Sequence, residues 1–94
     1  MRIARVEIYS EASDKNKRKH SVQDEEVREV FHNNPKITFI EKGHVDSENI
    51  YRALGKTNSG RFLLVIFIHK VDRSALVLSA RGMTAKERKR YGQK

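Results

Sequence analysis

The sequence contains no cysteine, one proline and only five glycines. The absence of cysteine excludes disulfides, thiolate metal sites and a cysteine nucleophile. Long apolar runs are also absent: the longest, residues 62–68, is far shorter than the roughly 20 residues that a membrane-spanning helix needs. The N-terminus alternates charged and apolar residues instead of presenting the apolar segment of a secretory signal. We therefore expect a cytoplasmic protein that does not enter a membrane.

The length of 94 residues has room for one hydrophobic core, so we expect a single domain over residues 1–94. Acidic residues are scarce relative to basic ones: 20 Lys and Arg face 12 Asp and Glu, a net charge of +8. Such a field favours an anionic partner. The basic residues concentrate in residues 15–20 and 81–94, which can form one footprint on a phosphate backbone if the fold joins them. The alternative is a solvated surface that happens to be basic.

The N-terminal third predicts a strand followed by helices. Apolar and charged residues alternate over residues 4–8, which is typical of a short half-buried strand. Residues 11–20 are compatible with a helix but carry almost no apolar stripe, so we expect a surface helix suited to binding. Ser21 and Asp24 form a variant capping box that predicts a second helix over residues 22–32, and Pro35 ends it.

The rest of the chain predicts an antiparallel sheet and a last helix. Extended segments are expected around Ile37 and Phe39 and over residues 50–56, 62–68 and 75–80, with a hairpin turn at residues 58–60. Residues 62–68 are apolar on both faces, which places them at the centre of the sheet. Thr84 and Glu87 are spaced as a capping box for a helix over residues 85–91. The expected class is α+β: a short N-terminal strand, helices, a three- to four-stranded antiparallel meander and a C-terminal helix.

Several short motifs follow one another in an order that resembles the BrnT family of toxins. They cover about residues 14–91 and read as follows: Asn16-x-x-Lys19-His20, Val30-Phe31, His44, Gly55-x-Thr57-x-x-Gly60-Arg61, Ser79-Ala80-Arg81 and Glu87-Arg88-x-x-Tyr91. The chain departs from the family in two places. Members usually carry a Trp-Asp pair where this chain has Ile8-Tyr9, and a glycine where it has Ser21.

The resemblance implies a RelE-like ribonuclease fold and cleavage of RNA that halts translation. It also implies neutralisation by a BrnA-like antitoxin with a ribbon-helix-helix DNA-binding part. The toxin would then contact operator DNA only through the antitoxin complex. No cofactor is expected.

Metal-free RNA cleavage uses the neighbouring 2′-hydroxyl as nucleophile, so the protein supplies a base, an acid and cations for the phosphorane. Arg81 is the first candidate because it lies where the last strand meets the final helix and its guanidinium can grip a phosphate with two hydrogen bonds. The alternative for Arg81 is a structural salt bridge. Arg61, just after the hairpin turn, is a second candidate or a solvated strand start.

Two histidines are candidates for proton transfer. An imidazole can act as base or acid near neutral pH, so His20 is one candidate, and the neighbouring Lys19 adds a cation. The alternative is that His20 packs at a helix junction. His44 lies in a polar segment and is either a second proton-transfer group or an ordinary loop residue. The four histidines show no ligand-type spacing, so no metal site is expected.

Further residues are candidates for RNA binding through charge or stacking. Tyr91 can stack on a base or pack the last helix onto the sheet, and Glu87 is either a capping residue or a general base. The basic candidates are Lys15, Lys17, Arg18, Arg88 and Arg90.

Three functions fit these observations. The first is a ribonuclease toxin. The second is a non-catalytic basic module that binds RNA or DNA, which would share the salt dependence of the first but would not cut RNA. The third is a protein-interaction subunit whose basic face docks an acidic antitoxin. Cleavage separates the first from the other two.

Overall fold

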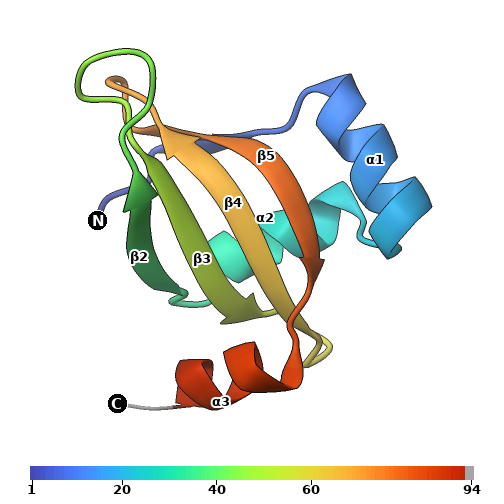
Figure 1. Cartoon of the computed structure of the whole chain (residues 1–94). Coiled ribbons are helices and arrows are strands. Elements are labelled where there is room, and N and C mark those ends of the chain that lie inside the picture. Colours follow the sequence, from blue (N-terminus) through green and yellow to red (C-terminus); the bar gives the residue numbers. More distant parts are fainter. Residues whose placement is uncertain (93–94) are drawn as a thin grey trace.

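The computed structural model describes residues 1–92 and confirms the α+β class. Figure 1 shows its elements, which follow one another along the chain. They are β1 Arg5–Glu7, α1 Ser10–His20, α2 Asp24–His32, β2 Lys36–Glu41, β3 Ile50–Lys56, β4 Phe62–His69, β5 Ser74–Gly82 and α3 Ala85–Gly92.

The strands form a five-stranded sheet in the order β1-β5-β4-β3-β2. The four strands β2 to β5 make the predicted antiparallel meander, and β4 lies at its centre as its two-sided apolar pattern indicates. The short strand β1 adds to the far edge of β5 in parallel, which the sequence pattern does not predict. Alternation identifies a strand, but it does not identify the partner of that strand.

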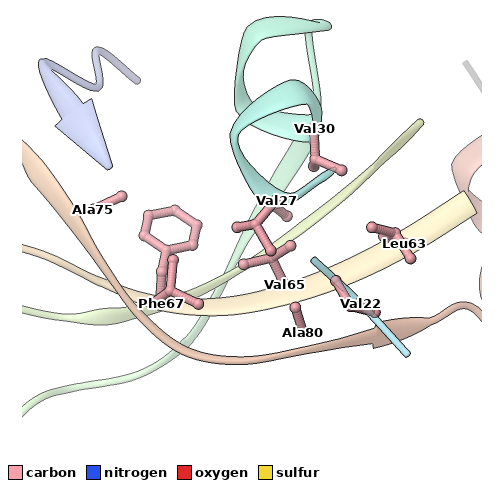
Figure 2. Close-up of a cluster of buried hydrophobic side chains, with 10 residues drawn as sticks. Val22, Val27, Val30, Leu63, Val65, Phe67, Ala75 and Ala80 are labelled. Atoms are coloured by element: carbon pink, nitrogen blue, oxygen red, sulfur yellow. The ribbon is translucent and has the colours of Figure 1, made fainter. Parts of the chain in front are cut away.

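The core lies between α2 and the sheet (Figure 2). Val27 and Val30 of α2 and Val65 and Phe67 of β4 are all fully buried, as helical and strand periodicity predict. Phe31 meets the Phe67 ring edge to face, with ring centroids 5.0 Å apart. This apolar layer fixes α2 across one face of the sheet.

α1 is a helix as predicted, but it is not simply a surface helix. It packs beside β5 (Figure 1) and buries two polar residues, Ser13 and Asn16. The Ser13 hydroxyl donates to Asp24 Oδ2 at 3.0 Å, which joins α1 to α2. A sequence without an apolar stripe can therefore still yield a packed helix when its buried side chains form hydrogen bonds.

The predicted capping box at Ser21 and Asp24 is wrong. Ser21 adopts a left-handed conformation, with φ 54°, that ends α1 instead of beginning α2. The residue that precedes α2 is Gln23, whose backbone N–H donates to Glu26 Oε1 at 3.0 Å. The reciprocal box lies two residues later than predicted because the preceding helix uses Ser21 for its own end.

The face of the sheet that α2 does not cover is the open face, and α3 lies across one end of it (Figure 1). The predicted capping box is confirmed: Thr84 N donates to Glu87 Oε1 at 2.8 Å, and Glu87 N donates to Thr84 Oγ1 at 3.2 Å. Tyr91 packs edge to face on Phe62, with centroids 6.0 Å apart, and holds α3 against β4. Within residues 1–92, no helix combines the length and the apolar character needed to cross a membrane.

Candidate active site and basic surfaces

Arg81 projects from β5 onto the open face, where Glu87 of α3 meets it. Its Cα is paired with Leu64 of β4, whereas the next pair, Ala80 and Val65, belongs to the core; neighbouring residues of a strand point to opposite faces. Arg81 Nη1 and Nη2 donate to Glu87 Oε1 and Oε2, each at 2.8 Å. The guanidinium thus holds a carboxylate in the two-bond geometry that would also hold a phosphate.

The ion pair shifts the pKa of both partners. The Arg81 guanidinium lowers the pKa of Glu87 from its ordinary 4.5 to about 2, and the backbone N–H of Thr84 adds to this. Glu87 in turn raises the pKa of Arg81. At neutral pH the pair is a carboxylate and a cation. The structural salt bridge that was the alternative role for Arg81 is therefore present. It occupies the guanidinium group that a phosphate would need.

A second arginine lies beside this pair with an unused hydrogen-bond donor. Arg52 of β3 points to the open face opposite Ile66, and its Nε is buried without a partner among the described residues. Thr38, its neighbour on β2, has a buried hydroxyl that is likewise unpartnered within residues 1–92. Buried polar atoms usually have a hydrogen-bond partner, so the unpartnered Arg52 Nε and Thr38 hydroxyl indicate a bound ligand or water. A cleft of about 250 Å³ opens here, lined by Arg52, Thr84, Lys86, Glu87 and Arg90.

Arg61 serves a different purpose from Arg81. Its Nη2 donates to the carbonyl of His20 at 3.0 Å, and its Nη1 donates to the carbonyl of Ser21 at 2.6 Å and to Glu26 at 3.1 Å. These carbonyls belong to the end of α1, where backbone acceptors lack partners within the helix. Arg61 therefore joins the β3–β4 hairpin to the junction of α1 and α2.

The two basic segments do not form one surface, so that expectation is wrong. Lys19 and His20 end α1 beside Arg61, which contacts α2 and so lies on the α2 side of the sheet. Arg81 lies on the open face with α3. The physical reason is that Arg61, just before β4, reaches the junction of α1 and α2, whereas the alternation of side chains along β5 directs Arg81 to the open face, although both residues lie near the same end of the sheet.

The histidines do not join Arg81 either. His44 lies in the loop between β2 and β3, at the end of β3 away from the hairpin turn at residues 57–60 (Figure 1). His20 supplies its backbone carbonyl to Arg61, as a residue at a helix junction does. Within residues 1–92, no three His, Asp or Glu side chains are grouped as metal ligands.

The candidate RNA-binding residues fall on α1 and α3. On α1, Lys17 and Arg18 are exposed, whereas Lys15 is half-buried and donates to the carbonyl of Leu78 at 3.1 Å. On α3, Arg88 stacks over the Phe62 ring with its guanidinium carbon 4.3 Å from the ring centroid, and Arg90 lines the cleft beside Glu87. Tyr91 packs against Phe62, so its packing alternative is the one observed. Lys94, the last residue of the basic segment 81–94, lies outside the described residues.

Sequence reasoning missed three residues of the open face: Arg52, Thr38 and Lys86. Arg52 left one signal, since it is the charged residue within the otherwise apolar alternation of residues 50–54. A charge among apolar residues of a central strand indicates a functional residue or a buried pair. Thr38 left none, because its position beside Arg52 depends on the register of β2 and β3.

Asn16, the first residue of the Asn16-x-x-Lys19-His20 motif, has a structural role in this arrangement. Its side chain is fully buried, and its Oδ1 accepts the backbone N–H of Ala80 at 3.0 Å. β1 pairs with β5 only as far as Leu76, so Asn16 takes the place of a neighbouring strand beyond that point. It thereby fixes the segment of β5 that carries Arg81.

We expect Asn16→Ala to lower the free energy of unfolding by about 1–2 kcal/mol. The buried Ala80 N–H loses its acceptor, and removal of the unpartnered Asn16 Nδ2 offsets part of that cost. Urea denaturation measures the change. Lys17→Ala on the exposed side of the same helix is the control and should shift stability by less than about 0.5 kcal/mol. Equal stability of the two variants would contradict this role for Asn16.

A comparison with protein families matches residues 9–87 to the model described as the ribonuclease toxin, BrnT, of type II toxin-antitoxin systems. A search of curated proteins gives no match. The family match spans most of the chain, from the end of the first strand to Glu87, and it confirms the resemblance read from the ordered motifs. The family description implies an RNA target and an antitoxin partner. The chain belongs to the BrnT family of ribonuclease toxins.

Proposed function

We propose that this protein is a metal-independent endoribonuclease whose reaction takes place on the open face, around Arg81. The observation that carries the proposal is the pairing of Arg81 with Glu87 beside a buried, unpartnered Arg52 Nε. Arg52 and Glu87 line one cleft, and Arg81 borders it through its two hydrogen bonds to Glu87. Guanidinium groups and a carboxylate in this arrangement are suited to a phosphodiester. Glu87 occupies the position on Arg81 that a phosphate oxygen pair would take.

The proposed reaction begins when an RNA phosphate replaces Glu87 at Arg81. The released carboxylate then loses the contact that lowers its pKa, so its affinity for a proton rises. Glu87 accepts the proton of the 2′-hydroxyl, the 2′-oxygen bonds to phosphorus, and the bond from phosphorus to the 5′-oxygen breaks. Lys86, which lines the same cleft, donates a proton to the leaving 5′-oxygen. The products are a 2′,3′-cyclic phosphate and a 5′-hydroxyl.

Arg81 and Arg52 stabilise the charge that develops on the phosphorane oxygens. Donors fixed before the reaction do this best, because no reorganisation is needed during the step. Arg81 also donates from Nη1 to the carbonyl of Gly82 at 3.0 Å, a contact that remains when Glu87 leaves, and the Arg52 Nε is buried on β3. Arg81 on β5 and Arg52 on β3 both lie on the open face, with β4 between them, which supports their assignment to the reacting phosphate.

In the cell, we propose that cleavage of RNA by this single domain inhibits translation in the cytoplasm. The toxin-antitoxin family implies a neutralising partner. We propose a BrnA-like antitoxin with a ribbon-helix-helix part, through which the complex contacts operator DNA. The net charge of +8 supports an anionic RNA substrate and an acidic contact surface on the antitoxin.

We expect the purified protein to cleave single-stranded RNA in excess EDTA and to leave cyclic phosphate ends. The 2′-hydroxyl is the nucleophile, so an oligonucleotide with 2′-O-methyl groups should resist cleavage and serve as the matched control. Gel analysis with end-group mapping measures both. Cleavage that stops in EDTA and resumes with added magnesium would contradict metal independence. Tight RNA binding without any scission would favour the non-catalytic module instead.

A further inference from the structure

We infer that a second site, the cleft between α1 and β5, binds unpaired nucleotides of the RNA. This inference deepens the proposed function and rests on it for the identity of the ligand. The cleft has a volume of about 730 Å³. It is lined by Tyr9, Ser10, Glu11, Ala12, Lys15, Arg18, Lys19, Leu76, Val77 and Leu78.

Tyr9 gives this cleft an exposed aromatic ring. The residue precedes α1 in an extended conformation, and its backbone carbonyl accepts the N–H of Ser13 at 2.9 Å, so the first turn of the helix fixes its position. The residue is 64% exposed, and among the aromatic contacts of residues 1–92 none involves its ring. An exposed aromatic side chain at a fixed backbone position is suited to stacking on a base.

Three cations of α1 face the same cleft. Lys15, Arg18 and Lys19 are three and four residues apart, a spacing that places them on one side of a helix. Arg18 and Lys19 are exposed and lie toward the C-terminal end of α1, whereas Tyr9 and Glu11 lie at its N-terminal end. The cleft is therefore aromatic at one end and cationic at the other, as required by a ligand with a base and a phosphate.

The wall of the cleft is the segment of β5 at which the pairing with β1 ends, at Leu76. A bulge at Leu78 interrupts the pairing with β4, and this side chain is 37% exposed. Lys15 donates to the Leu78 carbonyl and Asn16 accepts the Ala80 N–H, so α1 already satisfies the backbone here. Another strand cannot add to this edge by backbone pairing. What remains is a surface of side chains, partly apolar and partly cationic.

These features favour unpaired RNA over a duplex. The bases of an RNA helix are stacked inside it, so a duplex presents phosphates and 2′-hydroxyls to a basic surface and no free base face to Tyr9. Leu78 and Arg81 are three residues apart on β5, about 10 Å along a strand. A single strand bound in the cleft can therefore pass around the β5 edge to the open face.

The test measures RNA binding in an Arg81→Lys background, in which cleavage is expected to be reduced. Fluorescence anisotropy gives the Kd of a labelled single-stranded RNA oligonucleotide and of the matching duplex. We expect Tyr9→Ala to raise the Kd for the single strand by roughly 5- to 100-fold and to leave the Kd for the duplex unchanged. Tyr9→Phe keeps the ring and is the matched control. Tyr9 is exposed, so the melting temperature of each variant should match that of the parent.

A second pair of variants tests the cationic end. Arg18→Gln and Lys19→Gln should each weaken binding of both RNA forms. Each should also reduce the slope of log binding constant against log salt concentration by about one. Unchanged single-strand affinity in Tyr9→Ala, or equal loss for strand and duplex, would overturn the inference. The same holds if these variants bind RNA normally but resist the antitoxin, since the cleft would then serve the protein partner. RNA binding is measured separately from cleavage. Absence of cleavage by the wild-type protein would therefore refute the proposed function, whereas the Kd values alone decide whether the cleft binds RNA.

Discussion

Arg81→Ala is expected to lower the rate of RNA cleavage by about 10²- to 10³-fold, the usual loss when one fixed donor to a developing oxyanion is removed. The Arg81 guanidinium is the group on the open face with two donors aligned toward one partner. Single-turnover cleavage of a defined oligonucleotide measures the effect on the chemical step.

Arg81→Lys separates charge from geometry at this position. Lysine keeps the cation but offers no planar pair of donors, so we expect a loss close to that of alanine if two-bond recognition of the phosphate is essential. Arg73→Ala is the matched control, because Arg73 is exposed in the turn between β4 and β5, at the other end of the sheet. Removal of that charge should alter cleavage little. Full activity in Arg81→Ala would remove Arg81 from the mechanism.

Arg81→Ala also leaves Glu87 without its cation, and that effect must be distinguished from lost catalysis. The Glu87 side chain is 18% exposed, so its carboxylate would be partly buried and unpaired. The double variant Arg81→Ala/Glu87→Gln removes this charge. If the double variant regains stability but not cleavage, the loss in Arg81→Ala reflects the missing guanidinium.

The elements that the sequence predicted are those fixed by local interactions. The hairpin turn into β4, the apolar pattern of β4 and the Thr84–Glu87 capping box all depend on residues close together in the chain, and all three are present. The capping box at Ser21 failed because its geometry depends on the end of α1, whose carbonyl groups contact Arg61. That contact joins residues 40 positions apart, which no local pattern reveals.

The candidate site could be predicted only in part for the same reason. Arg81 and Glu87 lie six residues apart across a strand-to-helix junction, so the sequence identified both residues, though not their contact. Arg52 reaches the same cleft through the register of β3 with β4, which requires the whole sheet. The sequence also could not assign faces: Arg81 lies within β5 and points to the open face, whereas Arg61, just before β4, contacts the junction of α1 and α2.

Basic residues of the chain are divided between two sites, the α1–β5 cleft and the open face, and each site holds part of the charge. We therefore propose that RNA binding and RNA cleavage depend on different basic residues. Substitutions in the cleft should act mainly on RNA affinity, and substitutions around Arg81 should act mainly on the chemical step. In the proposed mechanism, the toxin binds RNA in the α1–β5 cleft and cleaves it only when a phosphate displaces Glu87.

Glu87→Gln is expected to lower kcat by about 10²- to 10⁴-fold, the range for loss of a general base. Glutamine keeps an oxygen that can accept the Thr84 N–H, so the capping contact survives while the proton acceptor is lost. Thr84→Ala is the converse control. It removes the hydroxyl that accepts the Glu87 N–H and costs about 1 kcal/mol of stability, but it leaves the carboxylate in place and should change kcat little. A lower KM with unchanged kcat in Glu87→Gln would show that Glu87 only competes with RNA for Arg81.

The same variant gives an independent measure of the ion pair through acid stability. Arg81 lowers the pKa of Glu87 from 4.5 in its ordinary state to about 2, so the folded state binds the proton less tightly than the unfolded state does. The ion pair therefore stabilises the fold fully above about pH 5, and this contribution disappears as the pH falls through 4.5 toward 2. We expect Glu87→Gln to be less stable than the wild type by on the order of 1–2 kcal/mol at pH 7. The expected loss is no larger because solvent screens the ion pair on the exposed side of Arg81. Urea denaturation at a series of pH values should show this difference shrinking toward pH 2, and a difference independent of pH would contradict the ionic origin of the contact.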